Sequence, residues 1–78
     1  MQEISYIGKV LDWHYDDGWG LIKCPELDGL CWVHYSVVNV AGYRALRPGA
    51  AVRVLIEAVE QDGYRFRATS VTPLPSAG

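Results

Sequence analysis

The sequence has no apolar run that approaches the ~20 residues of a membrane-spanning helix, and no helical pattern longer than a single turn. It also lacks a phosphate-binding loop, a nucleophile elbow, an internal repeat and a low-complexity segment. Its first residues show neither the basic region nor the apolar region of a signal peptide. We therefore expect a soluble, cytoplasmic protein that is not an enzyme, stays off membranes, and needs no cofactor and no small-molecule substrate.

Positive charge is scarce where a polyanion-binding protein would need it. The formal net charge of the 78 residues is −2. Residues 1–35 carry two bases and six acids, whereas residues 36–78 carry five arginines and three acids. This balance argues against a protein that depends on bulk attraction to phosphates.

Aromatic residues, in contrast, are concentrated in one stretch. The segment from Trp13 to Tyr35 holds all three tryptophans, both histidines, both cysteines and two of the five tyrosines. Such a concentration is typical either of the core of a small β-protein or of a surface that stacks on flat ligands.

Turn signals divide the chain into short β-strands. Asp-Gly at 17–18, Asp-Gly at 28–29, Pro-Gly at 48–49 and Asp-Gly at 62–63 separate runs rich in β-formers. We expect a single domain, an all-β, five-stranded antiparallel barrel of the OB type over residues 1–72, with a short flexible tail over 73–78. The expected strands span residues 4–13, 19–24, 31–35, 51–59 and 64–71, and Ser36 could cap a helical turn after the third.

Strand periodicity assigns the aromatic side chains to faces. Lys23 is almost never fully buried, so the residues that share its face in the second strand should point outward. Matching the third strand to the second gives the expected outward set Trp19, Leu21, Trp32 and His34, and the expected inward set Ile22, Cys24, Cys31 and Val33. The outward set predicts an exposed aromatic patch, and the alternative is that some tryptophans tuck under the loop at 36–49.

The cysteines and the aspartates of the first turn fit structural roles better than metal binding or catalysis. Cys24 and Cys31 share the inward parity while His34 points outward, and the spacing of six residues lacks the close pair of a structural zinc site. We expect core thiols, no metal, and no disulfide in a cytosol. Asp16 and Asp17 precede a glycine in a turn, where aspartate is favoured for local hydrogen bonds.

Two short motifs resemble the cold-shock domain family. Residues 17–22 (Asp-Gly-Trp-Gly-Leu-Ile) resemble its first RNA-binding motif, Lys-Gly-Phe-Gly-Phe-Ile, and residues 31–35 (Cys-Trp-Val-His-Tyr) resemble its second, Val-Phe-Val-His-Phe. Trp13 is similar to the family's tryptophan on the first strand and Tyr43 to its loop aromatic. The resemblance covers residues 6–72.

The resemblance implies a barrel that binds single-stranded RNA or DNA by aromatic stacking, as an RNA chaperone or a regulator of gene expression. The chain departs from the family where Asp17 and Asp12 stand in place of lysines and Leu21 in place of a stacking phenylalanine, so we expect weaker binding or a shallower salt dependence. A protein-interaction module on the same barrel is the alternative, and a monomer is expected. The residues expected to contact nucleic acid are Trp13, Trp19, Leu21, Lys23, Trp32, His34, Tyr35, Tyr43 and Arg67.

Overall fold

The computed structural model describes residues 5–40 and 45–75. Within them the chain forms five strands and one short 3₁₀ helix, with no helix long and apolar enough to cross a membrane. The elements are β1 (Ser5–His14), β2 (Trp19–Lys23), β3 (Leu30–His34), η1 (Tyr35–Val37), β4 (Ala51–Glu57) and β5 (Phe66–Pro73). The prediction of an all-β, five-stranded barrel is confirmed.

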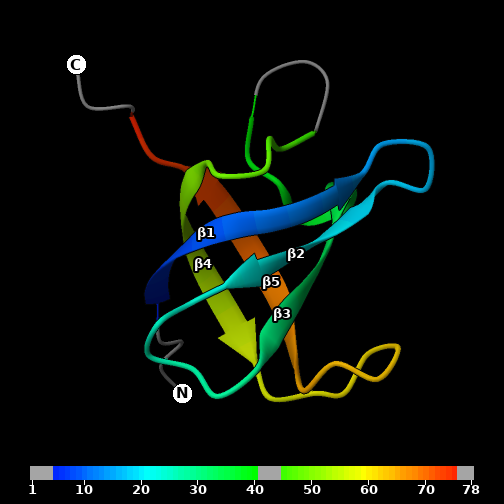
Figure 1. The fold of residues 1–78 in the computed structure, drawn as a ribbon, viewed down its shortest axis with the longest axis vertical. Helices are drawn as coiled ribbons and strands as arrows, with labels where there is room; N and C mark the ends of the chain where they lie inside the picture. The colour runs from blue at the N-terminus through cyan, green and yellow to red at the C-terminus, as the bar shows by residue number, and fades with distance from the viewer. Residues whose placement is uncertain (1–4, 41–44, 76–78) are drawn as a thin grey trace.

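The strands close into a barrel in the order β1-β2-β3-β5-β4, so the long β1 also pairs with β4. Figure 1 shows β1 crossing in front of β4 and β5, with β2 and β3 beside it. One pairing differs from the predicted antiparallel pattern, because β3 and β5 run parallel. The sheet is therefore mixed, with its parallel pair where β5 returns beside β3.

A β-bulge interrupts β1 and changes which residues face the core. Val10 pairs with Ile22, but the next pair joins Asp12 to Leu21, so Leu11 is an extra residue. Leu11 is 46% exposed, while Val10 and Trp13 on either side are both buried. An extra residue shifts the two-residue alternation by one position, so the inward parity of β1 is even before the bulge and odd after it.

The core is built mainly from aliphatic side chains, together with the two thiols and the indole of Trp13. β2 and β3 contribute Ile22, Cys31 and Val33, each 1% exposed or less, as their predicted inward parity requires. The buried cluster comprises Val10, Trp13, Ile22, Cys24, Cys31, Val33, Val38, Leu46, Val52, Val54, Ala68 and Val71. This cluster lies inside the barrel, and the outer surface of β1, β2 and β3 carries the candidate site.

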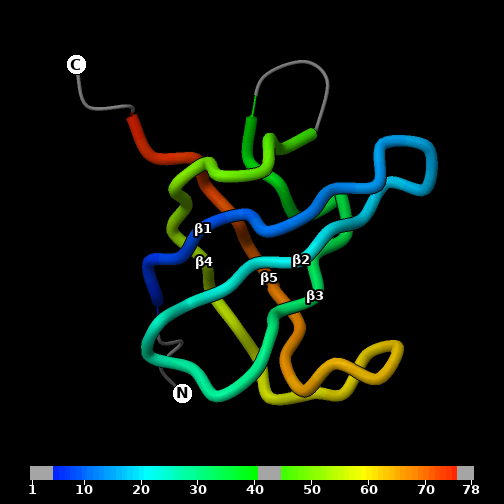
Figure 2. Tube along the Cα trace, viewed as in Figure 1, coloured from blue at the N-terminus to red at the C-terminus, as the bar shows by residue number. Residues whose placement is uncertain are grey.

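The connection after β3 begins with η1, which packs against β5. His34, and not Ser36 as expected, caps η1, with its Nδ1 accepting a hydrogen bond from the Ser36 N–H at 3.3 Å. Val38 then forms a bridge to Val71 and is buried. In Figure 2 the described segments of this connection, the green tube after β3 and the yellow-green tube that leads into β4, both run in the upper part of the view.

The last strand extends beyond its expected end. β5 continues to Pro73, two residues past the predicted Val71. The Leu74 N–H donates a hydrogen bond to the Ala51 carbonyl at 3.0 Å. The start of the expected tail is therefore attached to β4, and residues 76–78 lie outside the described part of the chain.

Candidate functional site

Five aromatic side chains form a row across the outer face of β1, β2 and β3. We call His14, Trp19, Trp32, His34 and Tyr35 the aromatic row. The centroids of neighbouring rings lie 4.0 Å apart (His14 to Trp19), 6.3 Å apart (Trp19 to Trp32) and 5.9 Å apart (Trp32 to His34), with planes within 22° of parallel. Tyr35 follows at 4.5 Å from His34, tilted by 42°.

The strand register places these rings side by side. His14 pairs with Trp19 across β1 and β2, and Trp19 pairs with His34 across β2 and β3. Directly opposite residues share a face, so all three side chains project outward. Trp32 lies two residues before His34 and shares its parity. The predicted outward set is correct for Trp19, Trp32 and His34, which are half-buried against one another.

Leu21 differs from its prediction although its parity is right. It pairs with Trp32 and Asp12 on the outer face, yet only 9% of it is exposed. It does not belong to the buried cluster inside the barrel. Leu21 therefore lies beside Trp32 on the outer face but offers a ligand almost no surface.

Trp13 was expected to stack on a ligand, but the structure places it in the core. It is 6% exposed and belongs to the buried cluster that also contains Val10 and Val33. The physical reason is the bulge at Leu11, which turns Trp13 inward and the flanking Asp12 and His14 outward.

His14 takes the outward stacking position that the family resemblance implied for Trp13. Its ring stacks on Trp19 at the closest spacing in the row. The imperfect alternation around Val10 and Leu11 was the available signal, since two consecutive apolar residues in a strand accompany a bulge as well as a register error.

Acidic groups border the row at its β1 end. The Asp12 Oδ2 lies 3.1 Å from His14 Nε2, and Asp12 Oδ1 accepts a hydrogen bond from the Trp13 N–H at 2.9 Å. Asp16 and Asp17 are exposed in the adjoining turn. A phosphate that approaches this end of the row would meet repulsion, because like charges in partial exposure still interact across a few ångströms.

The predicted cations do not offset those acids at the rings. Arg67 pairs with Trp32 in the parallel ladder, but its guanidinium forms a salt bridge with Glu57, with the Nε–Oε1 distance at 2.8 Å. Lys23 lies at the opposite end of β2, across from Lys9. Tyr43 lies outside the described residues.

The indole N–H of Trp32 is a buried hydrogen-bond donor. It has no hydrogen-bond partner among residues 5–40 and 45–75. A buried donor without a partner costs about 1–3 kcal/mol. The structure therefore leaves the N–H of Trp32 without a hydrogen bond, while the indole ring occupies the centre of the row.

The two thiols are buried in the core. Burial raises the pKa of Cys31 from 9.0 to about 12, and the neighbouring Cys24 adds to the effect. Burial and then Glu26 also raise the pKa of Cys24. Both thiols are free and buried, as predicted, and raised pKa values make them poor nucleophiles. In the described part of the chain, no group of three or more His, Cys, Asp or Glu could hold a metal ion.

The chain matches no protein-family model and no curated protein. Its function therefore has to be argued from the residues of the site.

Proposed function

We propose that this protein binds single-stranded nucleic acid, RNA or DNA, by stacking bases on the aromatic row. The observation that carries the proposal is the common orientation of four consecutive rings across three strands, with planes within 22° of parallel. Successive bases of a single strand also lie in parallel planes. Each base–aromatic stack contributes roughly 1–3 kcal/mol and tolerates any base, because every base has a π-face.

A single strand fits the row better than a duplex does. Bases in a duplex are covered by their neighbours, whereas bases in a single strand can be splayed onto aromatic side chains. The row lies on the convex outer surface of the barrel, where half-buried rings are accessible to such bases. The proposal involves no chemical step and no cofactor.

The resemblance to the cold-shock domain family supports the same proposal. The closed five-stranded barrel is the fold that the family motifs imply, and Trp19, Trp32 and His34 of those motifs lie together in the row. By this resemblance the protein would act in the cytoplasm as a monomeric RNA chaperone or regulator that keeps strands unpaired.

Affinity should come mainly from stacking, with a small contribution from charge. Single strands lose affinity with a slope of about −0.7 in log K against log salt for each neutralised phosphate. Arg67 lies opposite Trp32 but is paired with Glu57, so we expect it to neutralise at most one phosphate and the slope to lie between zero and about −0.7.

A fluorescence titration tests the proposal. Tryptophan emission is followed while oligo-dT or a blunt DNA duplex of equal phosphate content is added at two salt concentrations. We expect quenching by oligo-dT, little by the duplex, and the shallow slope given above. Absence of binding to oligo-dT even at low salt, or equal binding of the duplex, would refute it.

A further inference from the structure

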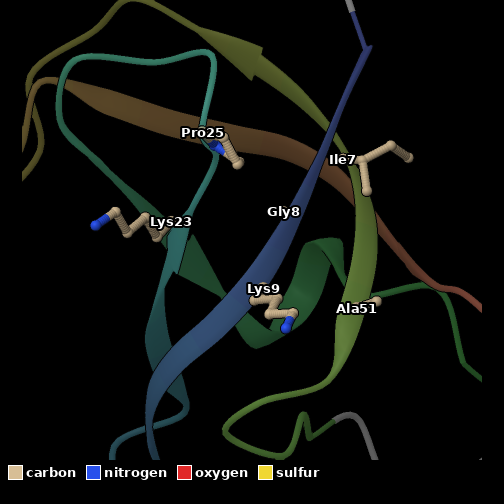
Figure 3. A pocket seen from close by; sticks show the side chains of 6 residues that line it. All are labelled: Ile7, Gly8, Lys9, Lys23, Pro25 and Ala51. Carbon is tan, nitrogen blue, oxygen red and sulfur yellow. The ribbon is translucent and has the colours of Figure 1, made fainter.

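A second binding surface is suggested by an interruption in the pairing of β1. Ser5 to Lys9 pair with β4, but pairing with β2 begins only at Lys9, which lies opposite Lys23. Among the described residues, 5–7 therefore have a neighbouring strand on one side only, whereas Gly8 is buried against Lys23 and Cys24, where the chain leaves β2. Figure 3 shows this stretch, with β4 beside it on one side and the segment at Pro25 diverging on the other.

An apolar hollow of about 400 Å³ lies at this edge. Its lining is Ile7, Gly8, Lys9, Lys23, Pro25 and Ala51. Ile7 is 48% exposed, so about half of this apolar side chain faces solvent beside the hollow. Pro25 has no N–H and cannot extend the β2 ladder, which is why the space opens where β2 ends.

Cations surround the hollow. Lys9 and Lys23 are directly opposite each other on the outer face, an arrangement of like charges that destabilises a sheet. Arg53 on β4 is opposite Ile7 on the same face. No salt bridge to these three cations occurs within residues 5–40 and 45–75. An anionic ligand would relieve the repulsion between the lysines.

We propose that this surface docks an acidic, extended peptide segment of a protein partner. The segment would add as a short strand beside residues 5–7, place one apolar side chain in the hollow, and set flanking carboxylates against Lys9 and Lys23. Addition of a strand to an exposed edge supplies main-chain hydrogen bonds for affinity, and pockets for alternate side chains supply specificity. The partner completes the ladder where Pro25 ends it.

The chemistry favours a peptide over a nucleic-acid strand. Unpaired backbone N–H and C=O groups are complementary to another peptide backbone, and the hollow presents apolar walls instead of ring faces. The surface is also separate from the aromatic row, since Ile7 and His14 are seven residues apart on β1, about 20 Å at the rise of a strand. The proposal thus does not rest on the nucleic-acid function.

The probe for this surface is an acetylated, amidated peptide, Glu-Val-Glu-Leu-Glu-Val-Glu, titrated into ¹⁵N-labelled full-length protein. We expect saturable shifts of the amides of Ile7, Gly8, Lys9 and Lys23, and no shift of the indole N–H signals of Trp19 and Trp32. Lys9→Glu should weaken binding by about tenfold, while Arg47→Glu, the same charge change at an exposed arginine elsewhere, should leave it unchanged.

Two altered peptides separate strand addition from charge alone. N-methylation of alternate residues keeps the side chains but blocks main-chain pairing, and should abolish binding when the methylated edge faces β1. Replacement of the glutamates by lysine should also abolish it. Binding that survives either change would overturn the proposal. Shifts at the indole signals, or competition by oligo-dT at Lys9 and Lys23, would also overturn it. Concentration-dependent shifts of the same amides without peptide would show instead that a second copy of the chain occupies the surface.

Discussion

Gly20 lies directly beneath the indole ring of Trp13. A Cβ built on Gly20 would collide with Cε3 of Trp13 and lie 2.5 Å from the carbonyl oxygen of Asp12. The two residues are partners across β1 and β2, so the missing side chain of one makes room for the ring of the other. Trp13 is consequently a core residue of the barrel, held in place by a glycine.

Trp13→Leu should therefore reduce the stability of the fold and leave the affinity for nucleic acid nearly unchanged. The substitution removes part of a buried ring, and we expect the free energy of unfolding to fall by about 2 kcal/mol. The affinity of the folded protein for oligo-dT should change less than twofold. Urea unfolding and a titration at low urea measure the two quantities, and a large loss of affinity in fully folded protein would assign Trp13 a contact with the ligand.

Gly20→Ala examines the same contact from the other strand. The added methyl has no space, so the cost should be about 1–3 kcal/mol, typical of an overpacked core. A neutral result would show that the ring of Trp13 is free to move away from Gly20.

Release of Arg67 should tighten nucleic-acid binding. Glu57→Gln removes the carboxylate that pairs with Arg67, which lies beside Trp32. We expect about threefold to tenfold higher affinity for oligo-dT and a salt slope steeper by about 0.7, as for one more neutralised phosphate.

Asp28→Asn is the matched control for this change. It removes the carboxylate, in the turn between β2 and β3, that pairs with Arg65 in an exposed salt bridge, while the Asp28 carbonyl still accepts a hydrogen bond from Arg65 Nη1 at 3.1 Å. It also adds one unit of net positive charge, so an equal gain in both variants would show that net charge, and not the position of Arg67, sets the affinity.

The stability of the fold should decrease at alkaline pH because the Cys31 thiol is buried. Its pKa is raised in the folded protein to about 12 from 9.0. Between these values the unfolded chain has lost the thiol proton that the folded chain retains, so the unfolded state binds fewer protons and stability falls as pH rises. Below pH 9 the effect is absent.

Cys31→Ala isolates this contribution from the other groups that titrate at high pH. The free energy of unfolding of the wild type should decrease more steeply between pH 8.5 and 10.5 than that of Cys31→Ala, although the variant is less stable at pH 7 because it leaves a cavity. Parallel curves for the two proteins would mean that the Cys31 thiol already titrates normally in the folded state.

Strand number and the faces of β2 and β3 could be predicted from the sequence. Both strands are short and regular, so one exposed residue, Lys23, was enough to orient Ile22 inward and Trp19 outward. The bulge at Leu11 could not be located in the same way, because a shift of one residue moves every later side chain to the other face. That shift exchanged the roles of Trp13 and His14.

Pairings between distant segments account for the other differences. Arg67 looked like a free cation in the sequence, but β4 lies antiparallel to β5 and brings Glu57 directly opposite it. The burial of Leu21 likewise depends on Trp32 from the neighbouring strand. Neither relationship is visible in a window of local periodicity.

Trp32 at the centre of the aromatic row allows the most direct test of the proposed function. Trp32→Phe keeps a flat ring and removes the buried, unpartnered indole N–H, so we expect equal or higher stability and oligo-dT affinity within about threefold of the wild type. Trp32→Ala removes the ring, and one lost base stack of roughly 1–3 kcal/mol corresponds to an affinity about 5-fold to 150-fold lower.

The decisive measurement is the affinity of Trp32→Ala for oligo-dT, followed by fluorescence of the remaining tryptophans, with Trp32→Phe as the control and circular dichroism to verify folding. Stacking on the aromatic row predicts that the alanine variant folds and loses most of its binding while the phenylalanine variant retains it. A folded alanine variant that binds as tightly as the wild type would contradict it.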